Sequence, residues 1–310
     1  MKRIRLIAMV LALGLLWGCS SEKQASEEAT QPPKPEIGLC VRNLADAPDY
    51  YDALEAELGQ QYTVRLVDCG NDQSQQDQKV AELAPECDLL VVEPVMVTAL
   101  DTVLATVAQQ AVPVIMLDRE PAREILDGNE NLYYLGLDLR SGGQAQAALT
   151  GNLPAGGDLN GDGTVSYMIL RGPTDHMDAQ AITAGCESAM AGQCLATADA
   201  QWTLEDGRAK CAQVLNKFGP DLEVILCNSP ELTQGAVEAV RNCGWMPGQD
   251  VYVLGFGYKD GIQTLLDQGA VSGTVWVSDS SRAQLLQDLV RKVLAGEPAD
   301  KCVYAPWDQK

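Results

Sequence analysis

Residues 158–166 read DLNGDGTVS, and an apolar, β-branched run, VSYMIL (165–170), overlaps the end of this stretch. Side-chain oxygens recur at alternate positions, at Asp158, Asn160 and Asp162. Gly163 takes the sixth place, where a sharp turn lets Thr164 offer its carbonyl, and this spacing suits a hard cation such as calcium. The twelfth position, which is acidic in a helix-loop-helix calcium site, is Ile169. The loop therefore lacks one ligand and leads into a strand, so the missing carboxylate comes from elsewhere.

Outward from this loop, apolar strand-like runs alternate with amphipathic stretches. Before the loop we predict strands at 37–41, 63–67, 88–92, 112–117 and 133–136, with helices at 50–58, 73–83 and 99–109. From the loop onward we predict strands at 165–170, 195–200, 223–227, 251–255 and 273–275, separated by helices that begin near Ala179, Leu204, Thr233 and Tyr258. Alternating strands and helices imply parallel sheets with right-handed crossovers, and two series imply two lobes of an α/β protein.

Ligands of open α/β sheets bind beyond the carboxyl ends of the strands, so the residues that follow the predicted strands are candidates for a site. In the first series they are Asp46–Tyr51, Glu93, Asp118 and Arg119; in the second they are His176, Asp178, Trp202, Asn228, Ser229, Phe256–Tyr258, Trp276 and Asp279. Planar polar groups and aromatic rings are the chemistry that a sugar requires, because hydroxyls need donors and acceptors while C–H faces stack on rings. For Asp178, a helix N-cap is an equally good interpretation.

The amino terminus has the pattern of a secretory signal. Lys2, Arg3 and Arg5 precede an apolar run that is too short to span a bilayer. The sequence LWGC, ending at Cys19, resembles the lipobox of bacterial lipoproteins, which implies a lipid-anchored Cys19 on the outer face of the cytoplasmic membrane or in the periplasm. A plain signal peptide with an incidental cysteine is the alternative. We therefore expect a signal peptide at 1–18 and a flexible, polar tether at 19–35.

The chain is strongly acidic. It has 310 residues, with 22 basic and 43 acidic side chains and a net charge of −21. Removal of the three basic residues of the signal leaves 19 basic against 43 acidic residues, a net charge of −24. Such a surface repels nucleic acid and anionic headgroups, so we expect no polyanionic partner.

Nine cysteines remain if Cys19 is lipidated, an odd number that leaves at least one thiol unpaired. There is no CxxC and only one histidine, so a zinc site is not expected. Cys186 and Cys194 are close enough in sequence to close a short disulfide loop, while other cysteines in strand-like runs suit buried small hydrophobes. Both interpretations of the pair stay open at this point.

DLNGDG, the strand after it and RGPTDHMDAQAIT (171–183) together resemble the calcium loop and first ligand-contacting segment of the periplasmic glucose/galactose-binding proteins. The resemblance runs from about Glu36 to Gly296. Further matching motifs are NDQSQQDQ (71–78), PVIMLDREPAR (113–123), YYLGLD (133–138), QGAVEAV (234–240) and GAVSGTV (269–275).

The resemblance implies a type I periplasmic binding protein, in which two lobes are joined by three hinge segments, here near Leu137, Trp276 and Lys301. The expected lobes are 36–137 with 277–300, and 138–276 with 301–310. It implies a structural calcium held by Asp158, Asn160, Asp162, Thr164, Ser166 and Glu223. Glu223 would supply the missing carboxylate, and the short side chain of Ser166 would be the weakest ligand.

The resemblance also implies ligand contacts, and the sequence departs from several of them. His176, Asp178 and the stacking Trp202 match the family pattern, and Asp46 lies in a region, NLADAPDYY, that is shortened. The departures are Glu93 in place of an amide, Ile182 in place of an arginine, Ser229 beside Asn228 in place of an asparagine, Gly257 in place of an aspartate and Val277 in place of an asparagine. Because each lost hydrogen bond costs about 1 kcal/mol, hexose specificity is expected to be altered.

We expect a monomeric, lipid-anchored solute-binding protein that captures a sugar, galactose, glucose or a relative, and presents it to an ABC importer. A receptor or sensor with a diverged ligand and a membrane partner is the alternative. An enzyme is disfavoured, because the sequence has no GxSxG motif, no P-loop and no histidine besides His176 that could pair with a nucleophile. The single loop in a long α/β chain also disfavours a dockerin-like calcium protein.

Overall fold

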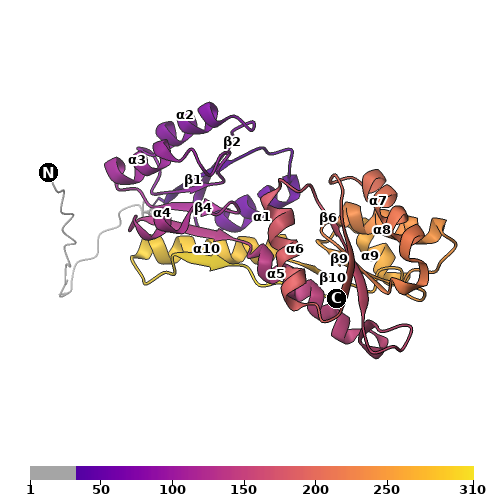
Figure 1. Ribbon diagram of the computed structural model, residues 1–310. Helices are drawn as coiled ribbons and strands as arrows, with labels where there is room; N and C mark the ends of the chain where they lie inside the picture. Colours follow the sequence, from indigo (N-terminus) through magenta and orange to yellow (C-terminus); the bar gives the residue numbers. More distant parts are fainter. Residues whose placement is uncertain (1–32) are drawn as a thin grey trace, which may run out of the picture. The chain divides into compact units, whose positions relative to one another are not determined.

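The computed structural model describes residues 33–310, and Lys34–Lys310 form one compact unit (Figure 1). The predicted signal peptide, Cys19 and nearly all of the tether lie outside the described residues. Within the described residues, no helix is both long enough and apolar enough to cross a bilayer.

The first lobe is a six-stranded sheet with strand order β11-β5-β4-β3-β1-β2, in which all neighbours pair in parallel. Its strands are β1 (Glu36–Val41), β2 (Thr63–Asp68), β3 (Leu89–Val92), β4 (Val114–Leu117), β5 (Leu132–Gly136) and β11 (Cys302–Tyr304). Its helices are α1 (Pro48–Gly59), α2 (Gln73–Leu83), α3 (Asp101–Gln110), α4 (Arg123–Asp127) and α10 (Asp279–Ala295).

The second lobe repeats this plan, with strand order β12-β10-β9-β8-β6-β7 and one antiparallel edge strand, β12. Its strands are β6 (Ser166–Arg171), β7 (Gln193–Asp199), β8 (Val224–Cys227), β9 (Tyr252–Phe256), β10 (Gly273–Trp276) and β12 (Asp308–Gln309). Its helices are α5 (Leu139–Ala148), α6 (Met177–Ala189), α7 (Leu204–Phe218), α8 (Pro230–Asn242) and α9 (Asp260–Asp267), with short 3-10 turns at Leu149–Asn152, Pro154–Gly157 and Gly219–Asp221.

Each sheet is covered on both faces, because alternate residues of a strand point to opposite sides. On β1, Leu39 packs in the core beneath α1 and α10, while Cys40 packs in the core beneath α2 and α3. On β6, Leu170 faces the core shared with α7 and α8, while Ile169 faces the core shared with α5 and α6. The predicted α/β class with two similar lobes is confirmed.

The chain passes between the two sheets three times. The first two passages lie between β5 and α5 and between β10 and α10, near the predicted Leu137 and Trp276. The third was expected near Lys301, with 301–310 in the second lobe, and this boundary is wrong. Cys302–Tyr304 instead pairs in parallel with β5, and the Lys301 ammonium donates to the carbonyl oxygens of Glu130 (2.6 Å) and Leu132 (3.1 Å). These bonds keep 301–304 with the first sheet, and only Asp308–Gln309 joins the second.

The structure also contains helices that the sequence analysis missed, α4, α5 and α10. In α5, Gly142 and Gly143 weaken the helical signal, because glycine is a poor helix former, yet both are buried. The nine cysteines of the described region are all unpaired, so the suggested Cys186–Cys194 disulfide is wrong. Cys186 is buried in α6, where its thiol donates to Oε1 of Gln146 (3.1 Å), while Cys194 is exposed on β7.

Glycines set the close packing of α5 on α6. A Cβ at Gly185 would lie 2.1 Å from the carbonyl oxygen of Arg140, and a Cβ at Gly143 would lie 2.1 Å from that of Ile182. We predict that Gly185→Ala forces these helices apart and costs about 1–3 kcal/mol, as overpacking does, and lowers the midpoint of thermal unfolding by several degrees.

The matched control is Gly59→Ala at the end of α1, where an added Cβ meets nothing within 4 Å. Its midpoint should be unchanged or slightly raised, because alanine favours a helix. Equal midpoints for the two variants would contradict the proposed role of Gly185.

Candidate functional site

The carboxylate of Glu93 is buried at the end of β3, with 5% of the residue exposed. Its Oε2 accepts hydrogen bonds from the hydroxyl of Tyr51 (2.8 Å) and the backbone N–H of Arg42 (3.0 Å), and its Oε1 lies 3.5 Å from Nε of Arg42. The Arg42 guanidinium also pairs with Asp46, whose Oδ1 accepts from Nδ2 of Asn43 (2.9 Å). Glu93 and Asp46, both predicted from the sequence, are therefore joined through Arg42.

The motif NDQSQQDQ positions the turn that carries Glu93. Asp72 caps α2 by accepting from the N–H of Gln75 (3.0 Å). The buried amide of Gln76 donates to the carbonyl oxygen of Glu93 (2.7 Å) and accepts from the N–H of Val95 (2.9 Å). The turn that carries Glu93 after β3 is thus held in place by α2, the helix that precedes β3.

A second charged cluster lies at the end of β4. Asp118, with the left-handed φ of 58°, pairs with Arg282 of α10 (3.3 Å). Arg282 also pairs with Asp279 (2.7 Å), and its guanidinium carbon lies 3.5 Å from the ring centroid of Tyr50. A left-handed backbone at a non-glycine residue is strained, and such strain clusters at functional sites. Arg42 and Arg282 were not among the site residues predicted from the sequence. The position of Arg42 directly after β1 was the available signal, whereas Arg282 joins the cluster only because α10 returns to the first lobe.

Burial changes the acidity of this cluster. Desolvation raises the pKa of Asp118 from 3.8 to about 6, although the Arg282 charge opposes the shift. Burial, with the charge of Asp118, also raises the pKa of Tyr50 well above its ordinary value, so this hydroxyl stays protonated. The cluster therefore holds a neutral donor, an arginine and a carboxylate that titrates near pH 6.

In the second lobe, His176 and Trp202 form an aromatic pair, with ring centroids 5.5 Å apart at 87°. The Trp202 ring lies on Gly172, where an added Cβ would come within 2.1 Å of it. His176, and not Asp178, is the N-cap of α6, because its Nδ1 accepts from the N–H of Asp178 (3.3 Å). A ring that accepts at Nδ1 carries its proton on Nε2, where it can donate to a ligand hydroxyl. Asp178 lies exposed in the first turn, and its side-chain oxygen is 3.9 Å from Nδ1 of His176.

Asn228 and Ser229 follow β8 and are both buried. Nδ2 of Asn228 donates to the carbonyl of Ala179 (3.1 Å) and to Oγ1 of Thr183 (3.0 Å), whereas Ser229 caps α8 by accepting from the N–H of Leu232 (3.2 Å). Asn228 is therefore oriented by α6, and Ser229 is occupied as a cap. Ile182, where the family pattern has an arginine, is buried in the core beside α5.

Unpartnered polar atoms gather at the strand ends. In the described part of the chain, five buried side-chain atoms have no hydrogen-bond partner within the protein, namely Arg42 Nε, Tyr50 OH, Asn228 Oδ1, Ser272 Oγ and Arg282 Nε. Arg42 and Asn228 directly follow the carboxyl end of a strand. Tyr50 and Arg282 contact Asp118, which follows the carboxyl end of β4. Ser272 belongs to neither group. Arg42 Nε lies 3.5 Å from Oε1 of Glu93, and the Tyr50 hydroxyl interacts with Asp118. Buried polar groups are normally paired, so the remaining atoms at the strand ends, Asn228 Oδ1 and Arg282 Nε, indicate where an external partner belongs.

The predicted calcium loop is closed by its own hydrogen bonds. Oδ1 and Oδ2 of Asp158 accept from the N–H groups of Gly161 (2.7 Å) and Gly163 (2.9 Å). The side chains of Asn160 and Asp162 accept from N–H groups two residues on, each at 2.8 Å. Glu223 is fully buried beneath the loop; its Oε1 accepts from Leu159 (2.7 Å) and Asn160 (3.0 Å), and its Oε2 accepts from Ser166 (2.7 Å).

The donor chemistry of this loop, all oxygen, fits calcium. Over residues 33–310, however, no group of three or more His, Cys, Asp or Glu side chains converges as a metal site would require. What the structure shows is that Glu223 fastens the loop to the start of β8.

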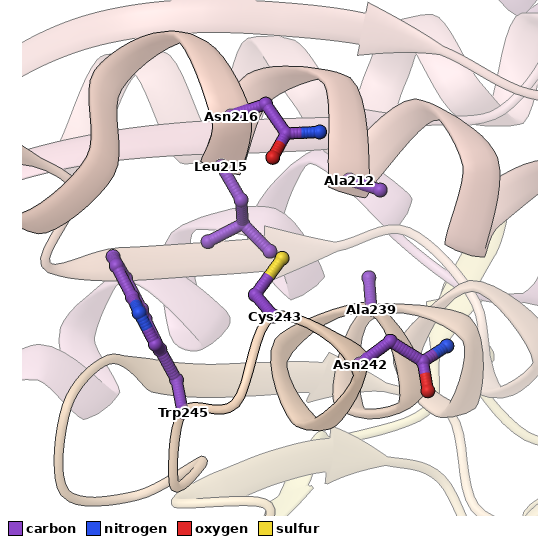
Figure 2. Close-up of a pocket in the computed structure, with 7 residues that line it drawn as sticks. All are labelled: Ala212, Leu215, Asn216, Ala239, Asn242, Cys243 and Trp245. Carbon is purple, nitrogen blue, oxygen red and sulfur yellow. The ribbon is translucent and has the colours of Figure 1, made fainter.

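A cavity of about 460 Å³ lies among residues of α7, α8 and the turn after α8 (Figure 2), lined by Ala212, Leu215, Asn216, Ala239, Asn242, Cys243 and Trp245. These helices run antiparallel to the strands they connect, so their carboxyl-terminal ends lie at the amino-terminal edge of the sheet. The cavity is therefore at the edge opposite the strand ends that carry Trp202 and Asn228, and it does not belong to the candidate site.

The raised pKa of Asp118 predicts a pH dependence of stability. The folded protein binds this proton more tightly than the unfolded chain, so the contribution is full below pH 4 and is lost as the pH rises through about 6. We predict that the stability of the natural protein relative to Asp118→Asn falls between pH 4 and 8 by on the order of 2–3 kcal/mol. Thermal unfolding of both proteins across this range measures the difference, with the exposed Asp127→Asn as control. Parallel curves for the natural protein and Asp118→Asn would contradict the prediction.

Comparison with known proteins identifies relatives of the whole chain. The chain is 26% identical to the ribose import binding protein RbsB of Bacillus subtilis over 322 residues, which cover 99% of this chain and 98% of that protein. It is 24% identical to the D-galactose/methyl-galactoside binding periplasmic protein MglB of Haemophilus influenzae over 245 residues, covering 75% and 72% of the two chains. A periplasmic ribose ABC transporter structure from Conexibacter woesei has the same fold, with a TM-score of 0.75, 16% identity and coverage of 89% and 91%.

The family model described as periplasmic binding protein domain matches residues 49–298. This match confirms the predicted type I fold family, and it confirms that the chain is a binding protein and not an enzyme. Since the family model matches residues 49–298, most of the 310 residues, the chain belongs to the periplasmic binding protein family.

Proposed function

We propose that this protein captures a sugar or sugar-like polyol at the carboxyl ends of its strands and delivers it to an ABC importer. The observation that carries the proposal is the presence of two buried, unpartnered atoms at those ends, Oδ1 of Asn228 and Nε of Arg282, together with the Trp202 ring of the second lobe. Hydroxyl groups can satisfy such donors and acceptors, and the C–H face of a sugar can stack on an indole. The relatives named for ribose and galactose support a sugar as the class, without a choice between pentose and hexose.

The charges at the strand ends favour a neutral ligand. In the first lobe, Arg42 and Arg282 are each paired with two carboxylates, and Arg119 donates to the backbone carbonyl of Pro94 (3.0 Å). In the second lobe, the family arginine is replaced by the buried Ile182. Because Arg42 and Arg282 are already paired with carboxylates, a sugar acid or sugar phosphate would find no unpaired guanidinium in these two residues.

The three chain passages between the sheets are consistent with transport by lobe closure. A ligand that contacts both lobes would favour a closed arrangement, by no more than its difference in affinity for the two states. The LWGC sequence supports a lipid anchor at Cys19 and an extracytoplasmic location, since that sequence resembles a lipobox.

We also propose that the DLNGDG loop binds calcium. Asp158, Asn160, Asp162 and the carbonyl of Thr164 would hold the ion, with Glu223 and Ser166 completing the set. The bound ion would stabilise a loop that Glu223 already fastens by three hydrogen bonds. Its role would be structural, since the loop lies at the amino-terminal edge of the second sheet.

We predict that a screen of the chain from residue 25 onward, which keeps the compact unit Lys34–Lys310, finds a neutral sugar or polyol that raises the unfolding midpoint. Saturation at a hundredfold over the dissociation constant adds about 2.7 kcal/mol. The panel contains ribose, arabinose, galactose, glucose, allose, inositol, sugar acids and amino acids. Trp202→Leu should weaken binding of the hit by about 1–2 kcal/mol through lost stacking, measured by calorimetry.

The control for this variant is Trp245→Leu, which removes a tryptophan far from the strand ends and should leave the affinity unchanged. A shift only with amino acids or only with sugar acids would contradict the proposed ligand class. If a sugar binds and the sugar-bound protein captures a sensor protein and no permease, the result would favour the receptor alternative.

We predict that calcium raises the unfolding midpoint of the natural protein, and that Glu223→Gln abolishes this increase. The variant should also be less stable without calcium, by about 2–3 kcal/mol, because it loses hydrogen bonds to a buried carboxylate. Thermal unfolding with calcium or with a chelator gives both quantities. The control is the exposed Glu187→Gln, for which neither should change. Equal midpoints of the natural protein in calcium and in chelator would contradict the metal proposal. The role of Glu223 in fastening the loop is then tested by the stability of Glu223→Gln without calcium.

A further inference from the structure

A second aromatic pair, Tyr258 and Trp276, lies at the carboxyl ends of β9 and β10. Their ring centroids are 5.0 Å apart and their planes are inclined by 35°. Tyr258 is 38% exposed and Trp276 is partly exposed, so the pair is not enclosed in the core. By contrast, the neighbouring Phe256 is buried and packs against Trp307 at 4.9 Å. The proposed function does not use Tyr258 or Trp276.

The pair is fixed by the backbone around it. Gly257 has a φ of 83°, which lets the chain turn sharply after β9. The N–H of Gly257 donates to the carbonyl of Val275 (2.7 Å), and its carbonyl accepts from Oγ1 of Thr274 (3.0 Å), so this turn is tied to β10. The Tyr258 hydroxyl donates to Oε1 of Gln263 on α9. The backbone of Trp276 lies opposite Asp308 in the antiparallel pairing of β10 with β12. A surface built in this way is ready for stacking without further ordering.

The pair and Trp202 lie over different strands of the second sheet. Trp202 rests on Gly172, directly after β6, and the sheet order β10-β9-β8-β6 puts two to three strand spacings, about 10–14 Å, between β6 and β9 or β10. Asn228, with its unpartnered Oδ1, follows the strand between, β8.

We infer that the ligand has two rings, a disaccharide or a glycoside, with the first ring on Trp202 and Asn228 and the second on Tyr258 and Trp276. This inference rests on the proposed sugar-binding function and deepens it. The positions beside the pair, Gly257 and Val277, are those where the family resemblance implies an aspartate and an asparagine. The two ring surfaces thus stand where this sequence has lost polar contacts to a single sugar.

The test compares ligands that share a first ring, by calorimetry on the chain from residue 25 onward. The pairs are galactose with lactose, galactose with phenyl galactoside, and ribose with adenosine. We expect at least one two-ring ligand to bind about tenfold or more tightly than its one-ring counterpart. In Trp276→Leu, and in Tyr258→Leu, this preference should fall to near one while the affinity for the one-ring ligand is kept.

The matched control is Trp245→Leu, which should keep the preference. Circular dichroism and the unfolding midpoint show whether each variant is folded; if Trp276→Leu does not fold, Tyr258→Leu carries the test. Binding of one-ring sugars with no preference for any two-ring partner, or equal losses for both ligands in the variants, would overturn this inference and leave the proposed function standing. Binding of no sugar in either class would overturn both.

Discussion

Each sheet of parallel strands must be covered on both faces, and the arrangement of the rest of the molecule follows from this requirement. Strands such as β3, LLVV, and β8, VILC, are apolar on both sides and cannot face water on either. Helices therefore occupy both faces of each sheet, and the connections that carry polar side chains are confined to the edges. Glu93 and Asp118 lie at the carboxyl-terminal edge of the first sheet, and Trp202 and Asn228 lie at that of the second.

Buried amides bind the edge loops to the layers beneath them. Gln76 of α2 holds the backbone of the turn after β3 through two hydrogen bonds. In the second lobe, Nε2 of the buried Gln146 donates to the carbonyls of Cys227 (2.8 Å), the last residue of β8, and Leu254 (3.0 Å), where the pairing of β8 with β9 stops. These side chains satisfy backbone groups that would otherwise be unpaired where the sheet ladder stops. Residues such as Glu93 and Asn228 are consequently presented by rigid turns.

The two lobes supply different chemistry to the candidate site. The first provides charged groups, with Arg42 and Arg282 each paired with two carboxylates. The second provides aromatic surfaces and amides, with a histidine, His176, whose Nδ1 accepts a hydrogen bond from the backbone of Asp178. The proposal of an uncharged ligand rests on the paired arginines and on the unpartnered amide oxygen of Asn228. Burial raises the pKa of Cys40 and Cys227 far above that of an exposed thiol, so both thiols stay protonated. They therefore act as small apolar side chains in the cores.

The periodicity of apolar residues was sufficient to predict the α/β class, two lobes and most strands, because burial on both sheet faces leaves a strong local pattern. It also located Glu93, Trp202 and Asn228, since the residue after a strand follows from the strand itself. It could not find α5, whose buried glycines are locally poor for a helix and are selected by contact with α6. Nor could it assign Cys302–Tyr304 to the first sheet.

By itself, then, the sequence determined which segments are strands, which residues end them and that the chain is a binding protein of this family. Only the tertiary structure decided which of those residues meet. Arg282 reaches Asp118 across 164 positions of sequence, and His176 forms the helix cap that was one of two interpretations of Asp178. The pairing of Tyr258 with Trp276 likewise depends on two strands lying side by side. Such contacts join distant parts of the chain, and no local pattern records them, because their free energy is gained only when the sheet is assembled.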